Sequence, residues 1–225
     1  KTPGKAYCFN GTCHYVKTLD ETRRLIGVTT TVKTSFYDDP KKDSYNPSNL
    51  TSSGEYFRAW KADNAASPIY PNGTKLLVWH PGTRKALTVR VNNAGPYWGD
   101  RKLDLSRAAA EALGMGGVAT LQVRVLEAPT KAEATYSKGR TYAPVKGYMG
   151  QYASLDSAFG AAGSSGSTRL ASIETPVKAA AAKVAATATK VAEPVKVAAA
   201  ITPKEAPAKK PAPAKVASAP SNADE

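Results

Sequence analysis

The chain has 225 residues, of which 42% are hydrophobic, and its formal net charge is +13. No hydrophobic run reaches the roughly 20 residues that a membrane-spanning helix needs, so the sequence predicts no transmembrane segment. The positive charge is spread along the chain instead of forming a dense basic stripe, which argues against specific recognition of nucleic acid. A diffusely basic protein is instead attracted to anionic polymers, such as those of a cell envelope.

Near the beginning of the chain, two cysteines stand on either side of a turn signal. Asn10-Gly11 favours a two-residue hairpin turn, and Cys8 and Cys13 then face each other at a non-hydrogen-bonded pair. A disulfide can bridge such a pair, so we expect a disulfide-stapled hairpin and an oxidising compartment. A metal site at these cysteines is disfavoured, because the segment offers too few ligands.

A short helix and a first long strand are expected next. Thr18 is a candidate N-cap for a helix over residues 19–26, with Glu21 at N3 as in a capping box. The run over residues 28–37 is rich in β-branched side chains, which predicts a strand. Residues 38–50 are polar and show no periodicity, so we expect an exposed loop there.

Three later segments are predicted to be strands, which are residues 74–79, 86–91 and 120–126. In the last two, apolar and polar residues alternate with a period of two. Such alternation turns one face toward a core and the other toward solvent or a groove.

One helix is predicted from residues that favour a helix start and a helix end. Ser106 is a favoured N-cap and Gly114 suits the left-handed position that ends a helix, so residues 107–113 are predicted to be helical. Asp104 stands just before this helix. We expect it to accept backbone hydrogen bonds that fix the turn, which is a structural role.

The last third of the chain has two parts of different composition. Residues 129–163 carry aromatic side chains that are expected to pin an extension onto the main domain; they are Tyr136, Tyr142, Tyr148, Tyr152 and Phe159. Residues 164–225 are rich in Ala, Lys and Pro. The prolines prevent a continuous helix, so we expect a disordered basic tail.

The most informative motif lies at residues 91–110, which read VNNAGPYWGDRKLDLSRAAA. This segment resembles the signature V-N-D-R-G-P-[FY]…R-x-[IL]-D-L-S-x-A-A-A of the rare lipoprotein A family of double-psi β-barrels. Further blocks resemble the family in the same order, and they are residues 35–37, 51–57, 64–74 and 113–119.

The resemblance implies a mainly β fold, namely a six-stranded double-psi β-barrel with one or two short helices. The barrel is assigned to residues 29–128. Residues 1–28 then form the hairpin and the short helix, residues 129–163 the extension, and residues 164–225 the tail.

Family members are bacterial cell-envelope proteins, and several are lytic transglycosylases that cut peptidoglycan glycan strands. In these enzymes a Glu, a His and an Asp face one another in a groove, and the resemblance places Glu55, Ser67 and Asn93 at those positions. The reaction needs a group that gives a proton to the glycosidic oxygen and later takes one back. A carboxamide has no ionisable proton. The substitutions therefore predict a glycan-binding barrel with lost or impaired catalysis.

Two alternatives remain for these positions. Asn93 and Ser67 could serve only to satisfy backbone groups in turns, as Asn and Ser commonly do. If catalysis persists, Glu55 is the best candidate acid, and Asp100 and His80 are poorer ones, since His80 falls at an expected hairpin tip.

Aromatic residues complete the predicted glycan-binding site. Tyr97 and Trp98 are adjacent in a turn, where their rings could stack on sugar rings, and Asn92 is expected to add hydrogen bonds. Trp60 and Tyr70 are weaker candidates for the same role.

The sequence thus leaves three functions open. The first is binding of peptidoglycan glycan strands, the second is an active endolytic lytic transglycosylase, and the third is a scaffold that binds an outer-membrane or septal envelope protein. We expect the periplasm or cell envelope of a Gram-negative bacterium, after removal of a signal peptide, because the chain starts without Met. No metal and no organic cofactor are expected, and Cys8 is not placed for a lipid anchor.

Overall fold

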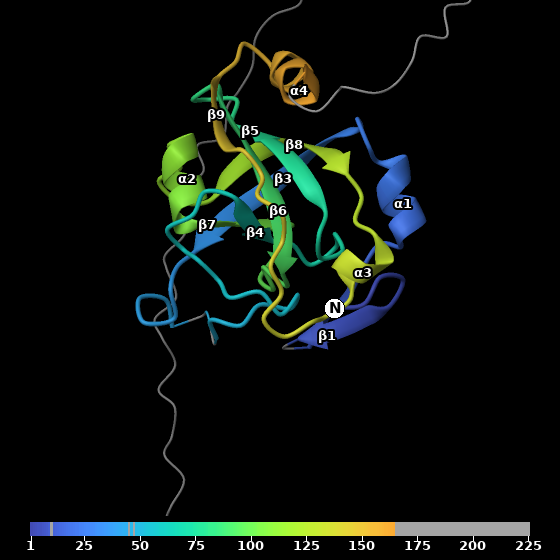
Figure 1. Ribbon diagram of the computed structural model, residues 1–225. Coiled ribbons are helices and arrows are strands. Elements are labelled where there is room, and N and C mark those ends of the chain that lie inside the picture. Colours follow the sequence, from blue (N-terminus) through green and yellow to red (C-terminus); the bar gives the residue numbers. More distant parts are fainter. Residues whose placement is uncertain (10, 45, 47, 165–225) are drawn as a thin grey trace, which may run out of the picture. The chain divides into compact units, whose positions relative to one another are not determined.

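The computed structural model describes residues 1–164, apart from residues 10, 45 and 47. Its centre is a six-stranded β-barrel (Figure 1). The predicted fold class, a mainly β barrel with few short helices, is confirmed. The barrel strands are β3 (Thr29–Tyr37), β4 (Asn64–Ala66), β5 (Lys75–Trp79), β6 (Lys85–Asn93), β7 (Leu103–Ser106) and β8 (Ala119–Glu127).

The barrel contains two parallel pairings, and one of them, between β4 and β6, closes it. The strands follow one another in the order β4-β7-β3-β8-β5-β6, and β4 also pairs with β6. β3 runs parallel to β7 and β4 runs parallel to β6, whereas the other barrel neighbours are antiparallel. Parallel neighbours need long connections. Here each such connection includes further strands, and residues of the loops after β3 and β6 line the cavity described below.

The interior of the barrel is filled by aliphatic side chains from alternate strand positions. Leu87, Val89 and Val91 of β6 are fully buried in it, as are Leu121 and Val123 of β8. These are the apolar positions of the predicted alternation. Burial of this aliphatic cluster is the main source of the stability of the barrel.

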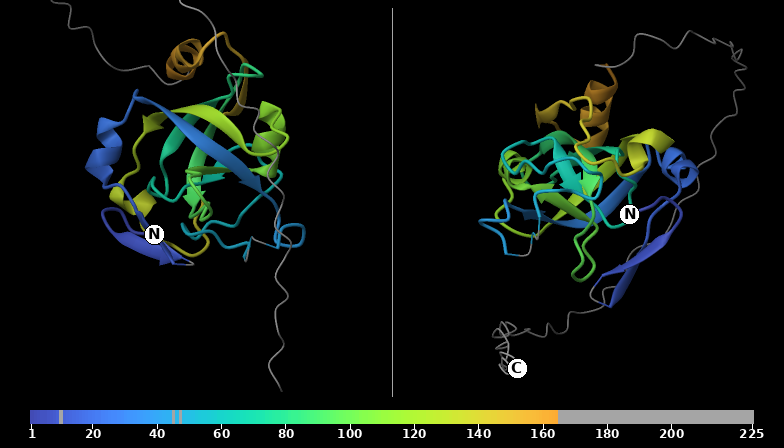
Figure 2. Two further views of the ribbon diagram at one scale, coloured as in Figure 1. Left: turned by 180° about the vertical axis from the view of Figure 1, so that it is seen from behind. Right: turned by 60° about the horizontal axis from the view of Figure 1, so that its bottom comes forward.

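Two helices flank the barrel on opposite sides (Figures 1 and 2). Helix α1 (Leu19–Arg24) has the expected capping box between Thr18 and Glu21, although it ends before residue 26. Helix α2 (Arg107–Leu113) has Ser106 as its N-cap and Gly114 in the left-handed conformation, as predicted.

The N-terminal hairpin consists of β1 (Ala6–Phe9) and β2 (Thr12–Tyr15). Cys8 pairs with Cys13, and a disulfide joins them with 4.0 Å between their Cα atoms, which confirms the predicted bridge. Asn10 of the predicted turn lies outside the described residues, and Gly11 has a positive φ of 77°.

The extension after the barrel contains three elements, α3 (Lys131–Ala134), β9 (Gly147–Gln151) and α4 (Leu155–Ser164). β9 pairs with β6, and Leu155 of α4 is buried against Leu77 and Trp79 of β5. The expected tail lies outside the described residues from 165 onward. Within the described part of the chain, no helix is long and apolar enough to cross a membrane.

Candidate functional site

A row of paired residues crosses four strands at one end of the barrel. Asn93 of β6 pairs with Ala66 of β4, and Ala66 pairs in turn with Asp104 of β7. Asp104 pairs on its other side with Ser35 of β3. Neighbouring strands are about 4.8 Å apart. Asn93 and Asp104 are therefore two strand spacings apart, with only a methyl side chain between them.

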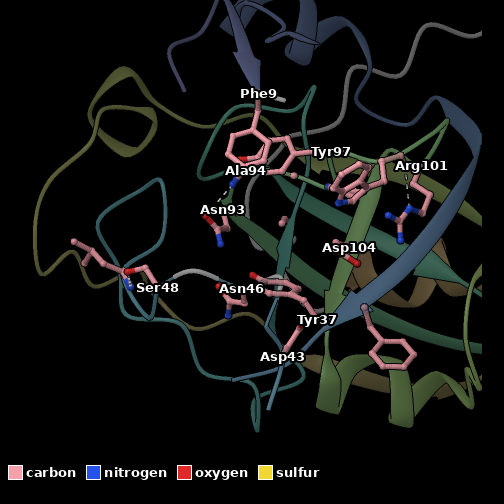
Figure 3. Close-up of a pocket in the computed structure, with 16 residues that line it drawn as sticks. Phe9, Tyr37, Asp43, Asn46, Ser48, Asn93, Ala94, Tyr97, Arg101 and Asp104 are labelled. Atoms are coloured by element: carbon pink, nitrogen blue, oxygen red, sulfur yellow. Dashed lines mark hydrogen bonds between the residues drawn. The ribbon is translucent and has the colours of Figure 1, made fainter. Parts of the chain in front are cut away.

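A cavity of about 550 Å³ opens over this row. Figure 3 shows Phe9 and Tyr97 on one side of the cavity and Tyr37 and Asn46 on the other, with Asp104 between them. We call this cavity the cleft. Its lining combines aromatic rings with polar groups, and the residues are Phe9, Phe36, Tyr37, Asp43, Asn46, Ser48, Leu50, Ala66, Asn93, Ala94, Gly95, Pro96, Tyr97, Trp98, Arg101 and Asp104.

The N-terminal hairpin forms one wall of the cleft. The ring of Phe9 stacks on that of Tyr97, with 4.1 Å between their centroids, and Tyr7 meets Tyr97 edge-on. Tyr97 is thus held under the hairpin, while its neighbour Trp98 remains 55% exposed at the rim. The Nε of Arg101 donates to the carbonyl of Trp98 and fixes this part of the turn.

Asn93 anchors two loops at the cleft. Its Oδ1 accepts hydrogen bonds from the backbone N–H groups of Ser52 and Ala94, both at 2.9 Å. Its carbonyl oxygen accepts a bond from the Nζ of Lys1 at 2.8 Å. Asn93 therefore both lines the cleft and holds backbone groups, so the two readings of this residue from the sequence do not exclude each other.

Asp104 lies in the floor of the cleft with its Oδ1 buried and without a hydrogen-bond partner among the described residues. Burial raises the pKa of Asp104 to about 6, against the opposing effect of the Ser35 hydroxyl and the Arg101 guanidinium. The Oδ1 of Asp104 accepts no backbone N–H of the described residues, and the expected role of Asp104 in fixing the turn stays a prediction.

Ser67 lies away from the cleft lining and is fully buried. Its hydroxyl donates to the carbonyl of Lys102 at 2.9 Å and accepts from the backbone N–H groups of Ile69 and Tyr70. In this arrangement Ser67 organises a turn and offers no free group to a ligand.

Glu55 and Asn92 meet each other on the other side of β6. The Nδ2 of Asn92 donates to Glu55 at 2.9 Å, and Arg58 forms an ion pair with the same carboxylate. A β-bulge causes this arrangement, since the pairing of β4 passes from Val91 directly to Asn93 and leaves Asn92 out of register. The structure therefore does not bring Glu55, Ser67 and Asn93 together around one cavity.

The weaker candidates from the sequence also lie outside the cleft lining. His80 accepts a backbone hydrogen bond from Gly82 in the hairpin between β5 and β6, and Asp100 pairs with Lys33 at the surface. Tyr70 is part of the barrel core, and Trp60 is 70% exposed.

Several cleft residues had no signal in the sequence. Phe9 was assigned to a hairpin, but no pattern says on which part of the barrel a hairpin docks. Tyr37 and Asn46 belong to a strand end and a loop without periodicity. The motif containing Asp104 was recognised, whereas the burial of its side chain was not. No three His, Cys, Asp or Glu side chains of the described residues are grouped so that they could hold a metal ion.

Comparisons with known proteins agree with this fold. A family model described as "Lytic transglycolase" matches residues 29–125. The probable endolytic peptidoglycan transglycosylase RlpA of Treponema pallidum (strain Nichols) is 35% identical over 88 residues, which cover 39% of this chain and 27% of that protein. The endolytic peptidoglycan transglycosylase RlpA of Escherichia coli (strain K12) is 39% identical over 71 residues, which cover 32% of this chain and 19% of that protein.

Among solved structures, the apo expansin of Clavibacter michiganensis is 21% identical with a TM-score of 0.33, covering 46% of this chain and 52% of that one. The matched part of this chain spans about a quarter or less of the length of the two curated relatives.

Proposed function

Because residues 29–125 belong to the lytic transglycosylase family of double-psi β-barrels, we propose that the chain acts in a bacterial cell envelope and binds peptidoglycan glycan strands in its cleft. The observation that carries this proposal is the composition of the cleft. Exposed Trp98 and the stacked pair of Phe9 and Tyr97 stand beside amide and carboxyl groups of Asn46, Asn93 and Asp104. Sugar rings have apolar faces and polar edges, and such a lining offers a partner to each.

The size and charge of the molecule support the same function. A cavity of about 550 Å³ is in the range that holds a ligand of a few hundred daltons. The net charge of +13 attracts the chain to the anionic polymers of an envelope, so binding in the cleft would begin from a raised local concentration.

Co-sedimentation with purified peptidoglycan sacculi tests glycan binding. Trp98→Ala should weaken binding about tenfold, equal to about 1.4 kcal/mol, because it removes the exposed ring at the rim of the cleft. Trp60→Ala is the matched control, since Trp60 is equally a surface indole but lines neither described cavity. Equal loss of binding in both variants, or in neither, would place the glycan elsewhere.

A second candidate function is catalysis with Asp104 as the proton donor. The observation in its favour is a carboxyl in the floor of the cleft whose pKa is about 6, so that about one-tenth of it is protonated at pH 7 and about half at pH 6. A protonated carboxyl can donate to a glycosidic oxygen, and the resulting carboxylate can accept the proton of the 6-hydroxyl that closes a 1,6-anhydro ring. One residue would then serve both steps.

Digestion of sacculi, followed by mass spectrometry of 1,6-anhydro products, separates the two candidates. If the protein cuts with Asp104, then Asp104→Asn should lower product formation by about 10²–10⁴-fold, and Glu55→Gln should retain activity. A loss in Glu55→Gln with normal folding would move the acid to Glu55. Binding without any anhydro product leaves the chain as a glycan-binding protein.

A further inference from the structure

Arg90 of β6 is almost completely buried, yet its guanidinium makes no hydrogen bond to the described residues; its charge acts on Glu133 without direct contact, and lowers the pKa of that carboxyl. Its exposed fraction is 3%, and none of its three guanidinium nitrogens has a hydrogen-bond partner among the described residues. Burying a cation without partners is costly, so buried charges in proteins are nearly always paired with an ion or ligand. The guanidinium of Arg90 therefore indicates a group that the protein alone does not supply.

A second cavity, of about 240 Å³, lies directly at this guanidinium. One side of it is formed by the barrel, and the other by residues 141–145 of the extension, outside the matched family domain. The ring of Tyr142 lies 4.7 Å from the Cζ of Arg90, and the Tyr142 hydroxyl donates to the carbonyl of Glu133. This stacking holds the flat guanidinium in place, while its three buried nitrogens stay without a hydrogen-bond partner among the described residues.

The other charged groups at this cavity are already engaged or peripheral. Glu55 is bound by Arg58 and Asn92, and Asp63 accepts a bond from the Nδ2 of Asn64. Lys61 adds a further positive charge from an exposed position. Arg58, Lys61 and Arg90 together outweigh Glu55 and Asp63 by one positive charge, and an anion is favoured.

We propose that this cavity binds a small organic carboxylate, such as the C-terminal carboxylate of a short peptide. The planar fork of a guanidinium matches the two oxygens of a carboxylate. Ala143, Pro144 and Val145 form one apolar edge of this otherwise polar cavity, and that edge suits a short aliphatic group next to the carboxylate.

The carboxylate site is separate from the cleft. The small cavity is lined by Arg90 and Glu55, and Asn92 is bonded to Glu55. The cleft is lined by Asn93 and Asp104, and the two cavities share no lining residue. The site goes beyond the proposed glycan binding. Changes at Arg90 should therefore leave the binding of peptide-free glycan strands intact, so failure of one proposal is distinguishable from failure of the other.

Calorimetric titration of the full chain with N-acetyl-alanyl-alanine and with its C-terminal amide tests the proposal. The acid should bind, and the amide, which lacks the charge, should bind at least about tenfold more weakly. No binding of the acid, or equal binding of the two compounds, would overturn the proposal and leave Arg90 as a guanidinium solvated by water.

Variants at Arg90 separate a ligand site from a structural role. Arg90→Met should abolish binding of the acid, and Arg90→Lys, which keeps the charge but loses the fork, should weaken it about tenfold or more. Arg23→Met, which removes an exposed arginine of α1, is the control and should bind normally. Arg90→Met also loses the stacking of the guanidinium on Tyr142, so its binding is measured at a temperature at which its melting curve shows it to be folded. Normal binding by Arg90→Lys and Arg90→Met would overturn the assignment.

Discussion

At the scale of single residues, burial decides what Asp104 and Arg90 can do. Both stand at strand positions whose neighbours in the sequence are ordinary for a β-barrel, and both have buried polar atoms without a partner among the described residues. Asp104 responds by holding its proton to a higher pH, whereas an arginine cannot lose its charge in a protein. The two residues are therefore suited to different ligands.

Asp104 makes the stability of the protein pH-dependent in a defined direction. Its pKa rises from 3.8 in the unfolded chain to about 6 in the folded protein, so between these values only the unfolded chain ionises, and stability is lost as the pH rises. The loss is on the order of 3 kcal/mol and is complete above about pH 6.

Asp104→Asn should remove this dependence. We expect the variant to be more stable than the natural protein at pH 7.5 and similar to it at pH 3.5, as measured by urea unfolding at both pH values. A stability difference that does not change with pH would show that the carboxyl of Asp104 is not buried as described.

At the scale of elements, the N-terminal hairpin is an addition that completes the cleft. The barrel strands supply the floor, but the wall at Phe9 comes from a hairpin outside the matched family domain. The hairpin region is tied to the barrel by the backbone bond from Lys17 to Ile69 and by the Nζ of Lys1, which donates to the carbonyls of Ser67 and Asn93. The disulfide then restricts its tip, where Phe9 stands.

Removing the disulfide should affect glycan binding more than barrel stability. A Cys8→Ser/Cys13→Ser variant lacks the disulfide. The folded hairpin is then less stable by on the order of 2 kcal/mol, which is the stabilisation expected from a disulfide that closes a loop of this length. Phe9 is then held less firmly on Tyr97. We expect weaker sedimentation with sacculi and a melting temperature of the barrel within a few degrees of the natural protein; unchanged sacculus binding would argue that the hairpin wall is not used.

Most elements could be predicted from the sequence, and the failures have a physical cause. Strands with clear alternation, such as β6 and β8, were found within two residues of their ends, and both caps of α2 were identified. β4 and β7 were missed, because they have only three and four residues and nearly all of these are buried, so no alternation marks them.

The sites depend on features that a local pattern does not carry. The motif around Asn93 identified one part of the cleft. The spacing of residues in the sequence does not predict the β-bulge that places Asn92 and Glu55 on the other side of β6. The alternation placed Arg90 on the face of its strand that turns toward solvent or a groove. Its burial results from residues 141–145, which lie some fifty positions later in the chain.

At the scale of the whole molecule, the extension packs against the barrel and completes the second cavity, the one at Arg90. β9 continues the sheet next to β6, α4 packs on β5, and the segment between α3 and β9 covers Arg90. The extension is therefore part of the same folded unit as the strands that it covers. This arrangement places a proposed glycan site and a proposed carboxylate site on one folded unit.

A substitution in the extension should therefore destabilise the barrel as well. Leu155→Ala removes a buried side chain from the cluster with Leu77 and Trp79, and we expect the free energy of unfolding to fall by about 2–4 kcal/mol in one cooperative transition. Tyr148→Ala, at an exposed position of β9, is the control. Two separate transitions in thermal unfolding would indicate that the extension folds independently.

The central claim is that the cleft around Asn93 binds the glycan, and NMR titration with peptide-free glycan fragments tests it most directly. On adding fragments to ¹⁵N-labelled protein, the indole N–H signal of Trp98 and the side-chain amide of Asn93 should shift together, with the indole signal of Trp60 unchanged. Shifts confined to Trp60, or to residues outside the cleft lining, would contradict the claim.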